Sequence, residues 1–394
     1  MRNKIYIILL IIAALGCKQP YNPKAISSVN SVGYLVVEGV INTGNDSTII
    51  KLSRTVPLSS KARSKPEPGA VVTIVNNTGN SYQLTESGNG FYKTASLNLS
   101  PTNLYGLRIV TSAGVVYQSD LVAVKNSPPI DSVYYQITNN GLNIYADTHD
   151  PANQTKYYRW EFIDTYLFHS GFSSFSYLSH NPDTVLPRSP SQMVYFCWRS
   201  DTSSNILINS SAKLAKDIIA DNLLTSIASN AEQIEDRYSI IVKQYALTPE
   251  AFNYFQQLKK NSEQLGSIFD AQPSELPGNI HCITNPSEPV LGYITAGTPS
   301  QMRIFIDNRK LPAWRAVNPY QGCKLDTDLF KKPIGNGSTF ENDVAYYIYS
   351  GIESPVYPVA PPGSPIIGYA ASSPFCVDCT LRGTNIKPSF WIDY

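Results

Sequence analysis

The sequence has few charged residues and almost no net charge. Only 15% of its 394 residues are charged, against roughly 25% in ordinary soluble domains. It carries 31 basic and 30 acidic residues, and without Arg2 and Lys4 the balance becomes 29 against 30, a net charge of −1. Attraction to nucleic acid or to an anionic bilayer by charge alone is therefore excluded. Ser, Thr, Asn and 26 Tyr residues take the place of charges, a composition that favours β-sheets and exposed aromatic surface.

The sequence also lacks the motifs of a hydrolase. Its four histidines are His149, His169, His180 and His281. None of them lies in an HExxH motif, and no GxSxG turn occurs, so no nucleophile is paired with a base. The carboxylates of a glycosidase would have to face each other across a cleft, and nothing in the sequence places Asp131, Glu161 and Asp164 in that way. We predict a protein that is not an enzyme and uses no cofactor.

The stretch DTHD, Asp147 to Asp150, combines residue types that bind cations. Two carboxylates and an imidazole within four residues could hold Ca²⁺ or another cation. The spacing matches no defined metal loop, however, and Asp150 precedes Pro151 at a predicted turn. We expect a solvated strand end and no bound metal.

One apolar run, Ile5 to Leu15, suggests a membrane segment but is too short to span a bilayer, which takes ~20 residues. Polar Lys18 and its neighbours follow it at once, and Arg2 and Lys4 supply positive charge before it. These are the parts of a secretory signal. We predict that residues 1–16 are a signal peptide that is removed.

The end of this signal resembles the lipobox of bacterial lipoproteins, in which a Cys is acylated and becomes the new N-terminus. The matching residues are Ala14, Leu15, Gly16 and Cys17, with Leu two residues before the Cys where three is usual. The resemblance implies lipidation of Cys17, for example by palmitate, and an anchor that is effectively permanent, because each buried methylene adds ~0.8 kcal/mol. The alternative is an ordinary secretory signal with a free Cys nearby.

Five other cysteines are candidates for disulfides: Cys197, Cys282, Cys323, Cys376 and Cys379. An exported compartment is oxidising, and an odd number leaves at least one cysteine unpaired. CVDC, Cys376 to Cys379, has the spacing of a redox or metal site, but no second CxxC or nearby His completes a zinc site. We expect one of this pair to bond Cys323 and Cys197 to bond Cys282.

Short β-branched runs dominate the chain and predict a mainly β protein. After a tether at 17–32, residues 33–125 read as an N-terminal antiparallel β-sandwich. The strand candidates are 34–41, 47–53, 70–76, 81–86, 104–111 and 115–124. Between them lie NTGND, NNTGN, SGNG and SAG, whose Asn and Gly residues supply the positive φ of tight hairpins. The two prolines of NSPPIDSV, 126–133, mark the boundary to the next domain.

Residues 126–394 are predicted to form a second, fibronectin/Ig-like β-domain with a helical insertion at about 210–270 and an irregular C-terminal segment. In YYRWEF, alternation places Tyr158 and Trp160 on one face and Tyr157 and Arg159 on a wet face. Thr248 as N-cap and a following Pro predict a helix over 248–266, whereas 212–228 is ambiguous between helix and strands. The Pro-rich stretch 354–374 is not expected to form regular structure.

Aromatic residues in two loop-like stretches are candidates for an interface. They are Tyr166, Phe168, Phe172, Phe175 and Tyr177 in the first stretch, and Tyr346, Tyr347, Tyr349 and Tyr357 in the second. Exposed aromatics suit contact with a protein or a sugar, because each offers a large area at a small entropic cost. The alternative is that they pack the loops onto the sheets.

The landmarks together resemble the family known by the label DUF4249, a domain of unknown function found in outer-membrane lipoproteins of the Bacteroidota. The matching stretches are 34–55, 68–74, 127–133, 157–162, 261–280, 290–294 and CVDCTLRGTNIKPSFW at 376–391. The resemblance implies a lipid-anchored outer-membrane protein, on the periplasmic or the cell-surface side, that is made alongside a TonB-dependent transporter. It carries over no functional residue.

Three functions follow as hypotheses. The first is a non-enzymatic accessory or ligand-capture partner of a TonB-dependent transporter, with an unidentified nutrient as ligand. The second is a stand-alone surface lipoprotein that binds a carbohydrate or a peptide. The third, an enzyme, would require a deep cleft with convergent carboxylates.

Overall fold

The chain divides into two compact units. A computed structural model describes residues 33–56, 64–180, 183–263, 278–335, 337 and 339–393. Unit 1 comprises Met1–Val124 and Leu276–Ala296, and unit 2 comprises Lys125–Glu275 and Gly297–Tyr394. The signal, the tether and Cys17 lie outside the described residues. The predicted second domain included residues 276–296, which the structure places in unit 1.

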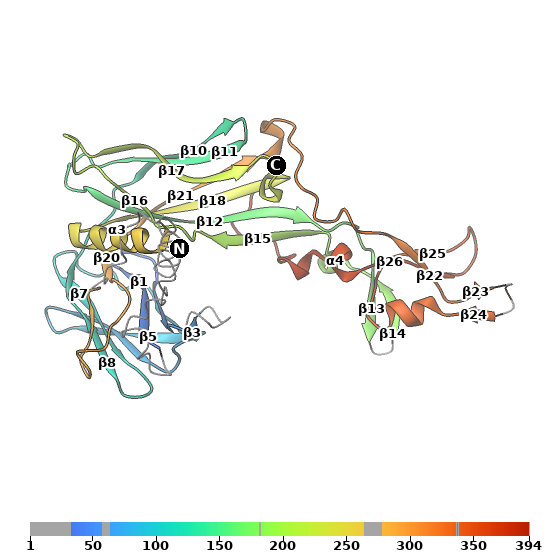
Figure 1. The fold of residues 1–394 in the computed structure, drawn as a ribbon, viewed down its shortest axis with the longest axis horizontal. Coiled ribbons are helices and arrows are strands. Elements are labelled where there is room, and N and C mark those ends of the chain that lie inside the picture. The colour runs from blue at the N-terminus through green and yellow to red at the C-terminus, as the bar shows by residue number, and fades with distance from the viewer. Residues whose placement is uncertain are drawn as a thin grey trace, which may run out of the picture. The chain divides into compact units, whose positions relative to one another are not determined.

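The strands of unit 1 form one continuous sheet, in which neighbouring strands from β19 to β1 pair antiparallel (Figure 1). Its strands run in the order β19-β8-β7-β4-β5-β6-β2-β1-β20, with β3 paired to β2 and β9 to β7. Their bounds are β1 (Leu35–Asn42), β2 (Thr48–Arg54), β3 (Lys65–Pro66), β4 (Val71–Asn76), β5 (Ser81–Gly88), β6 (Phe91–Thr94), β7 (Leu104–Val110), β8 (Val116–Ser119), β9 (Val122–Ala123), β19 (Ile280–Cys282) and β20 (Thr295–Gly297). Because β5 pairs with both β4 and β6, it joins the two faces of the predicted sandwich.

Alternation along the strands explains the core of unit 1. Leu35 and Val37 of β1 are buried, and so are Ile50 and Leu52 of β2, whereas Ile49, the residue directly before Ile50, is exposed. Successive side chains of a strand point to opposite faces, so one face of the sheet forms the core and the other faces solvent.

The hairpin turns predicted from Asn and Gly are present. Gly79 between β4 and β5 has a φ of 87°, and Gly114 between β7 and β8 has a φ of 79°. Asn89 between β5 and β6 has a φ of 52°. Most side chains disfavour positive φ, and Gly and Asn tolerate it. The turn residues therefore allow these strands to pair as hairpins.

Unit 2 contains a two-layer β-sandwich, which agrees with the predicted fold class. One layer is β10-β11-β17 and the other is β15-β12-β18-β21, with β16 also paired to β12. Their bounds are β10 (Ile130–Thr138), β11 (Gly141–His149), β12 (Tyr157–His169), β15 (Phe196–Thr202), β16 (Leu207–Ser210), β17 (Ile218–Ala228), β18 (Arg237–Ala246) and β21 (Ser300–Asp307). One hydrophobic cluster contains buried residues from both layers, among them Ile144 of β11 and Ile240 of β18.

The helix α3 (Pro249–Glu263) lies against the outer face of β12 (Figure 1). The side chain of Thr248 accepts a hydrogen bond from the Ala251 N–H at 3.2 Å, as predicted for an N-cap. The ring centroids of Tyr157 and Phe252 lie 4.9 Å apart, so α3 covers part of the predicted wet face. The helical part of the predicted insertion is α3, because the ambiguous 212–228 contains strand β17 and strand β18 follows it.

The Pro-rich C-terminal segment has more regular structure than predicted. It contains a sheet of β22 (Asp326–Leu329), β26 (Gly368–Ser372) and β25 (Ser354–Val359), and a hairpin of β23 (Lys332–Ile334) and β24 (Thr339–Glu341). The expectation that 354–374 is irregular is wrong. Strand β25 accommodates Pro355 and Pro358 because it pairs with β26 alone, as an edge strand, and a bulge lies between its paired residues Pro355 and Tyr357.

Short elements complete unit 2. They are the hairpin of β13 (Ser176–His180) and β14 (Asp183–Pro187), the π-helix η4 (Val344–Ile348), the helix α4 (Pro374–Val377), and the 3-10 turns η1 (Pro190–Gln192), η2 (Glu232–Ile234), η3 (Asn308–Lys310) and η5 (Cys379–Leu381). In the part of the chain that is described, no helix has the length and apolar character needed to cross a bilayer.

Candidate functional site

Two disulfides stabilise the C-terminal segment, one within the segment and one that ties it to strand β15. Cys323 bonds Cys376, which confirms the expectation that one cysteine of CVDC pairs with Cys323. Cys197 of β15 bonds Cys379, not Cys282, so that predicted pair is wrong. Cys282 is free and buried. The error has a structural reason, because Cys282 lies in the segment that returns to unit 1, whereas Cys197 lies in unit 2.

The first disulfide lies at the base of a small substructure that we call the C-terminal module, residues 323–377 together with the hairpin at 174–187. Ser174 Oγ donates to the Pro355 carbonyl at 2.8 Å, and the Phe175 N–H donates to the Val356 carbonyl at 2.8 Å. Figure 1 shows β13, β14 and β22–β26 grouped beyond one end of β12 and β15. The module has a hydrophobic cluster of its own, centred on the buried Val344, Ile348, Tyr369 and Ala371.

The predicted interface aromatics divide into buried and exposed sets. Tyr166 and Phe168 belong to the sandwich core, so the prediction that they line a surface loop is wrong. Four others are partly buried: Phe172 and Tyr349 pack against clusters of the module, Tyr177 lies under Arg188, and Tyr347 contacts Tyr346. Phe175, Tyr346 and Tyr357 are exposed, and 65% of Tyr346 is accessible to solvent.

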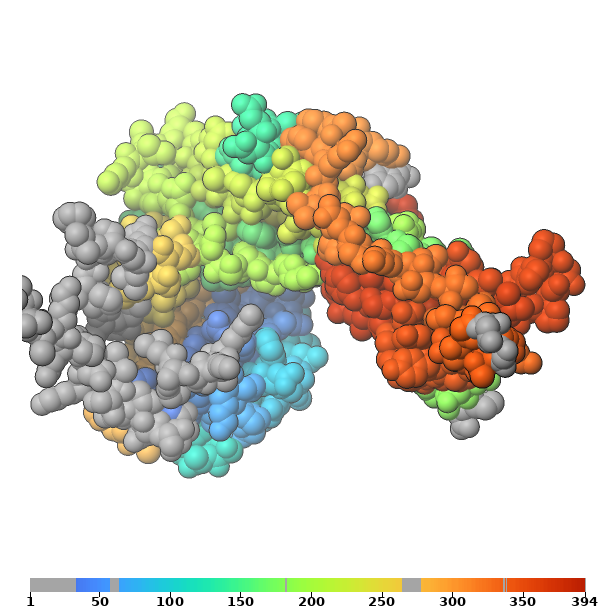
Figure 2. Space-filling model, turned by 45° about the vertical axis from the view of Figure 1, so that its right-hand side comes forward, coloured from blue at the N-terminus to red at the C-terminus, as the bar shows by residue number. Residues whose placement is uncertain are grey.

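Further apolar side chains of the module are exposed, and the sequence analysis did not single them out. They are Ile334, Phe340, Ile352, Ile366, Ile367 and Phe375. Figure 2 shows the surface of this region, coloured orange to red, with the hairpin of β13 and β14 in green beside it. These residues lie in short strands and turns between Pro and Gly residues, where no alternation pattern distinguishes a buried from an exposed position.

Two cations in and beside the module, Lys332 and Arg188, bond to groups within it. Lys332 Nζ lies 3.0 Å from an Asp343 carboxylate oxygen and 3.3 Å from one of Glu341, and these hydrogen bonds raise the pKa of Lys332. Arg188 donates to Ser174 Oγ at 3.2 Å and to the Ser176 carbonyl at 3.0 Å. Burial lowers the pKa of Arg188.

The carboxylate oxygens of the DTHD stretch accept hydrogen bonds from neighbouring groups of the protein. The Asp150 carboxylate accepts hydrogen bonds from three backbone N–H groups of the turn that follows it, at 2.8–2.9 Å. Asp147 accepts from Ser132 Oγ at 3.0 Å and from the Asp221 N–H at 2.7 Å. His149 pairs with Asp131 at 2.8 Å, and this hydrogen bond raises the pKa of His149. Within the described ranges, no group of three or more His, Cys, Asp or Glu residues could hold a metal ion.

The structure does not bring the other candidate carboxylates together. Glu161 and Asp164 lie three residues apart on β12, so their side chains point to opposite faces. Glu161 pairs with Arg159 at 2.7 Å. Asp164 accepts hydrogen bonds from the Asp201 N–H and from Tyr238 Oη, both at 3.2 Å, and burial raises the pKa of Asp164.

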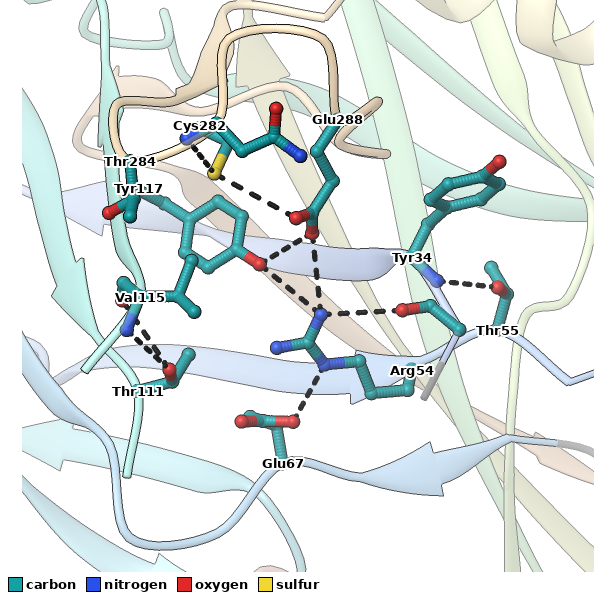
Figure 3. A network of polar contacts seen from close by, with 12 residues as sticks. Tyr34, Arg54, Thr55, Glu67, Thr111, Val115, Tyr117, Cys282, Thr284 and Glu288 are labelled. Carbon is teal, nitrogen blue, oxygen red and sulfur yellow. Dashed lines mark hydrogen bonds and ion pairs between the residues drawn. The ribbon is translucent and has the colours of Figure 1, made fainter. Parts of the chain in front are cut away.

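A polar network inside unit 1 was not predicted (Figure 3). Arg54, at the end of β2, has a side chain that is 7% exposed; its Nε lies 2.8 Å from a Glu67 carboxylate oxygen. A second guanidinium nitrogen donates to Tyr117 Oη at 3.2 Å and lies 3.6 Å from Glu288. Tyr117 Oη in turn donates to Glu288 at 2.6 Å. Burial alone would lower the pKa of Arg54, but its hydrogen bonds to Glu67 and Tyr117 raise it.

This network fastens the returning segment 278–296 to the sheet. Glu288 belongs to that segment, while Arg54 and Tyr117 belong to β2 and β8. The free thiol of Cys282 lies beside it, 3.9 Å from the Glu288 carboxylate, and accepts a hydrogen bond from the Asn285 N–H at 3.3 Å. Alternation along β2 places Arg54 on the same face as the buried Ile50 and Leu52, so a charged residue at a core-facing strand position was the local signal of this network.

Comparison with known proteins identifies one family. The family described as "Domain of unknown function (DUF4249)" matches residues 18–303. No curated protein matches the chain. Among solved structures, the "Structure of Yersinia pseudotuberculosis adhesin InvE" is matched with 9% identity and a TM-score of 0.14, over 54% of this chain and 54% of that one. The match thus spans about half of the adhesin's length, and a TM-score this low supports no statement about fold or function.

Proposed function

Because the chain belongs to the DUF4249 family, we propose that it is a non-enzymatic cell-envelope lipoprotein of the Bacteroidota. In this proposal the acylated Cys17 anchors it in the outer membrane, and the C-terminal module docks onto a TonB-dependent transporter, either to assemble it or to pass it a captured nutrient. The anchor rests on the signal and lipobox pattern of residues 1–17.

Export is supported by the two disulfides. Cys197–Cys379 and Cys323–Cys376 each join parts of unit 2 that lie far apart in the sequence, with separations of 182 and 53 residues. Such bonds persist in oxidising compartments and are rare where glutathione and thioredoxin keep thiols reduced. The disulfides therefore favour a location outside the cytoplasm.

The observation that carries the docking proposal is the set of exposed apolar side chains on the C-terminal module. Phe340 is 60% and Tyr346 65% exposed, and the module that presents them is held by a disulfide and has a buried core of its own. Exposed apolar groups on an ordered scaffold are typical of protein interfaces, where aromatic anchors provide much of the binding free energy.

The docking proposal is tested by affinity capture from solubilised outer membranes. The acylated wild-type protein should retain a barrel transporter, and the double variant Phe340→Ser/Tyr346→Ser should lose at least tenfold of it. Leu214→Ser is the matched control, because Leu214 is an apolar residue of unit 2 outside the module and is 54% exposed. Equal capture by both variants, or capture of no barrel by the wild type, would refute the proposal.

The anchor is tested separately. Wild-type protein should incorporate labelled palmitate and sediment with the outer membrane, and Cys17→Ser should do neither. An unlabelled wild-type product would contradict the lipoprotein assignment but would not bear on the docking proposal.

A stand-alone carbohydrate receptor is a second candidate, favoured by one feature of β10 and β11. Tyr134 and Tyr145 form a half-exposed stacked pair, with ring centroids 5.6 Å apart, and Asn143 donates to Tyr145 Oη at 3.1 Å. Aromatic rings next to amides are suited to sugars. A receptor of this kind would bind glycans in the absence of any barrel, so titration of the protein from Lys18 onward against a glycan panel distinguishes it from the first proposal.

A further inference from the structure

Two carboxyl groups inside the C-terminal module have buried oxygen atoms without a donor. Asp328 of β22 is 3% exposed, and its Oδ2 has no hydrogen-bond donor among the described residues. The same is true of Oε2 of Glu353, which lies directly before β25. A buried polar atom that lacks a partner costs free energy comparable to a lost hydrogen bond, so this pair requires an explanation.

The side chains of Asp328 and Glu353 hydrogen bond to each other. Burial, together with Glu353, raises the pKa of Asp328. Burial also raises the pKa of Glu353, and the hydrogen bond to Asp328 acts against that rise. Ionised carboxylates only accept hydrogen bonds, so such a bond requires one proton on the pair. Because this hydrogen bond favours the protonated form of Asp328 and the ionised form of Glu353, Asp328 carries the proton and Glu353 accepts.

The neighbouring charges do not neutralise the pair. Asp326 on the same strand and Asp343 at the start of η4 add negative potential at Asp328. Lys332, a cation near the pair, is engaged by Asp343 at 3.0 Å and by Glu341 on β24. Strand β26 contributes Tyr369, which is neutral in this pH range at its ordinary pKa, and burial raises that pKa further. Burial, followed by the charges of Glu353 and Asp343, raises the pKa of Asp328 to about 7.

We propose that Asp328 and Glu353 share one proton, and that this proton is a pH-sensitive latch which holds β22 against the turn before β25. The turn is also joined to η4, because the Glu353 N–H donates to the Tyr347 carbonyl at 2.9 Å. Release of the proton places two negative charges in the interior of the module and loosens the segment that presents Tyr346. The effect on docking rests on the proposed function; the latch itself does not.

The direction of the pH effect follows from linkage. The folded module holds the proton up to about pH 7, whereas an unfolded Asp releases it near pH 4. The module is therefore most stable at low pH, and it loses this stability as the pH rises from about 4 to about 7, by up to about tenfold in the opening constant per pH unit. Above about pH 7 the opening constant no longer changes with pH.

The test is amide hydrogen exchange on the full mature chain without any partner, between pH 5 and 7. After correction for the intrinsic exchange rate, protection in β22 and β25 should fall about 100-fold in the wild type. Asp328→Asn keeps a donor to Glu353 at every pH and should abolish this slope. Asp326→Asn is the matched control, since Asp326 lies on the same strand but is exposed, and should retain the slope.

Three outcomes would overturn the latch: a flat wild-type profile, a slope that persists in Asp328→Asn, or a slope that Asp326→Asn removes as well. If Asp328→Asn does not fold, Glu353→Gln serves in its place and should show a clearly smaller slope, because it removes the carboxylate charge that raises the pKa of Asp328 while burial remains. If the wild type captures no barrel but keeps the pH slope, the docking proposal is refuted and the latch is not.

Discussion

The network around Arg54 allows a quantitative prediction, because a free thiol lies beside it. Arg54→Met removes the cation that lies between Glu67 and Glu288 and leaves both carboxylates without it. Breaking a fully buried ion pair costs about 3–5 kcal/mol. The two carboxylates are partly accessible to solvent, so we expect the lower end, about 3 kcal/mol, in the free energy that holds segment 278–296 on the sheet.

The assay is labelling of Cys282 by a thiol reagent under native conditions without reductant. In the protein from Lys18 onward, Cys282 is the free cysteine, because the other four described cysteines form disulfides. If the thiol reacts only when the segment opens, a loss of about 3 kcal/mol speeds labelling by about 100-fold, since 1.4 kcal/mol corresponds to a factor of ten. Labelling of both proteins in denaturant must proceed at the same rate.

Lys51→Met is the matched control. Lys51 lies on the same strand and pairs with Glu38 at 2.8 Å, but both side chains are exposed, and such pairs contribute less than about 1 kcal/mol. Its labelling rate should stay within about fivefold of the wild type. If Arg54→Met also stays within that range, the network does not hold the segment and the reasoning is refuted.

Three further predictions concern unit 2. The double variant Cys323→Ala/Cys376→Ala should lose about 4 kcal/mol in the stability of the C-terminal module, from the entropy of a 53-residue loop; limited proteolysis should then cut within 326–372, and an unchanged digestion pattern would contradict this. The hydrogen bond to Asp131 raises the pKa of His149. The stability that this bond contributes is therefore present below the ordinary pKa of His and is lost as the pH rises through the raised pKa of His149. An NMR titration should show the pKa of His149 return to its ordinary value in Asp131→Asn. Gln244 is fully buried and hydrogen bonded through both amide atoms. Replacing it by Met should lower the free energy of unfolding by about 2–3 kcal/mol, and a shift in the thermal midpoint of less than 2 °C would argue against that loss.

How much of the fold could be predicted depends on how far apart along the chain the interacting residues lie. Ile50 and Leu52 were recognisable as core residues because strand alternation is a local pattern, and Thr248 was recognisable as a cap because its partner lies three residues away. The failed expectation for 354–374 has the opposite cause. Prolines disfavour a central strand, and only the sheet order shows that β25 is an edge strand.

The candidate site was predicted less well than the fold. Tyr166 and Tyr346 are both aromatic residues in similar sequence surroundings, but the first is a core residue of the sandwich and the second is exposed on the module. The difference depends on which segments cover each side chain. The segments that decide this lie far away along the chain, and composition does not identify them.

By itself, the sequence determined the β-class of the protein, its hairpins and the helix after Thr248, because period-two alternation, positive-φ turn residues and helix caps act over a few neighbouring positions. The tertiary structure alone decided that Cys197 meets Cys379, that Glu288 returns to Arg54, and that Asp328 and Glu353 lie together inside the module. Each of these pairings closes a loop of 25 to 234 residues along the chain, and many alternative closures of similar entropic cost exist, so only the packing of the complete chain selects among them.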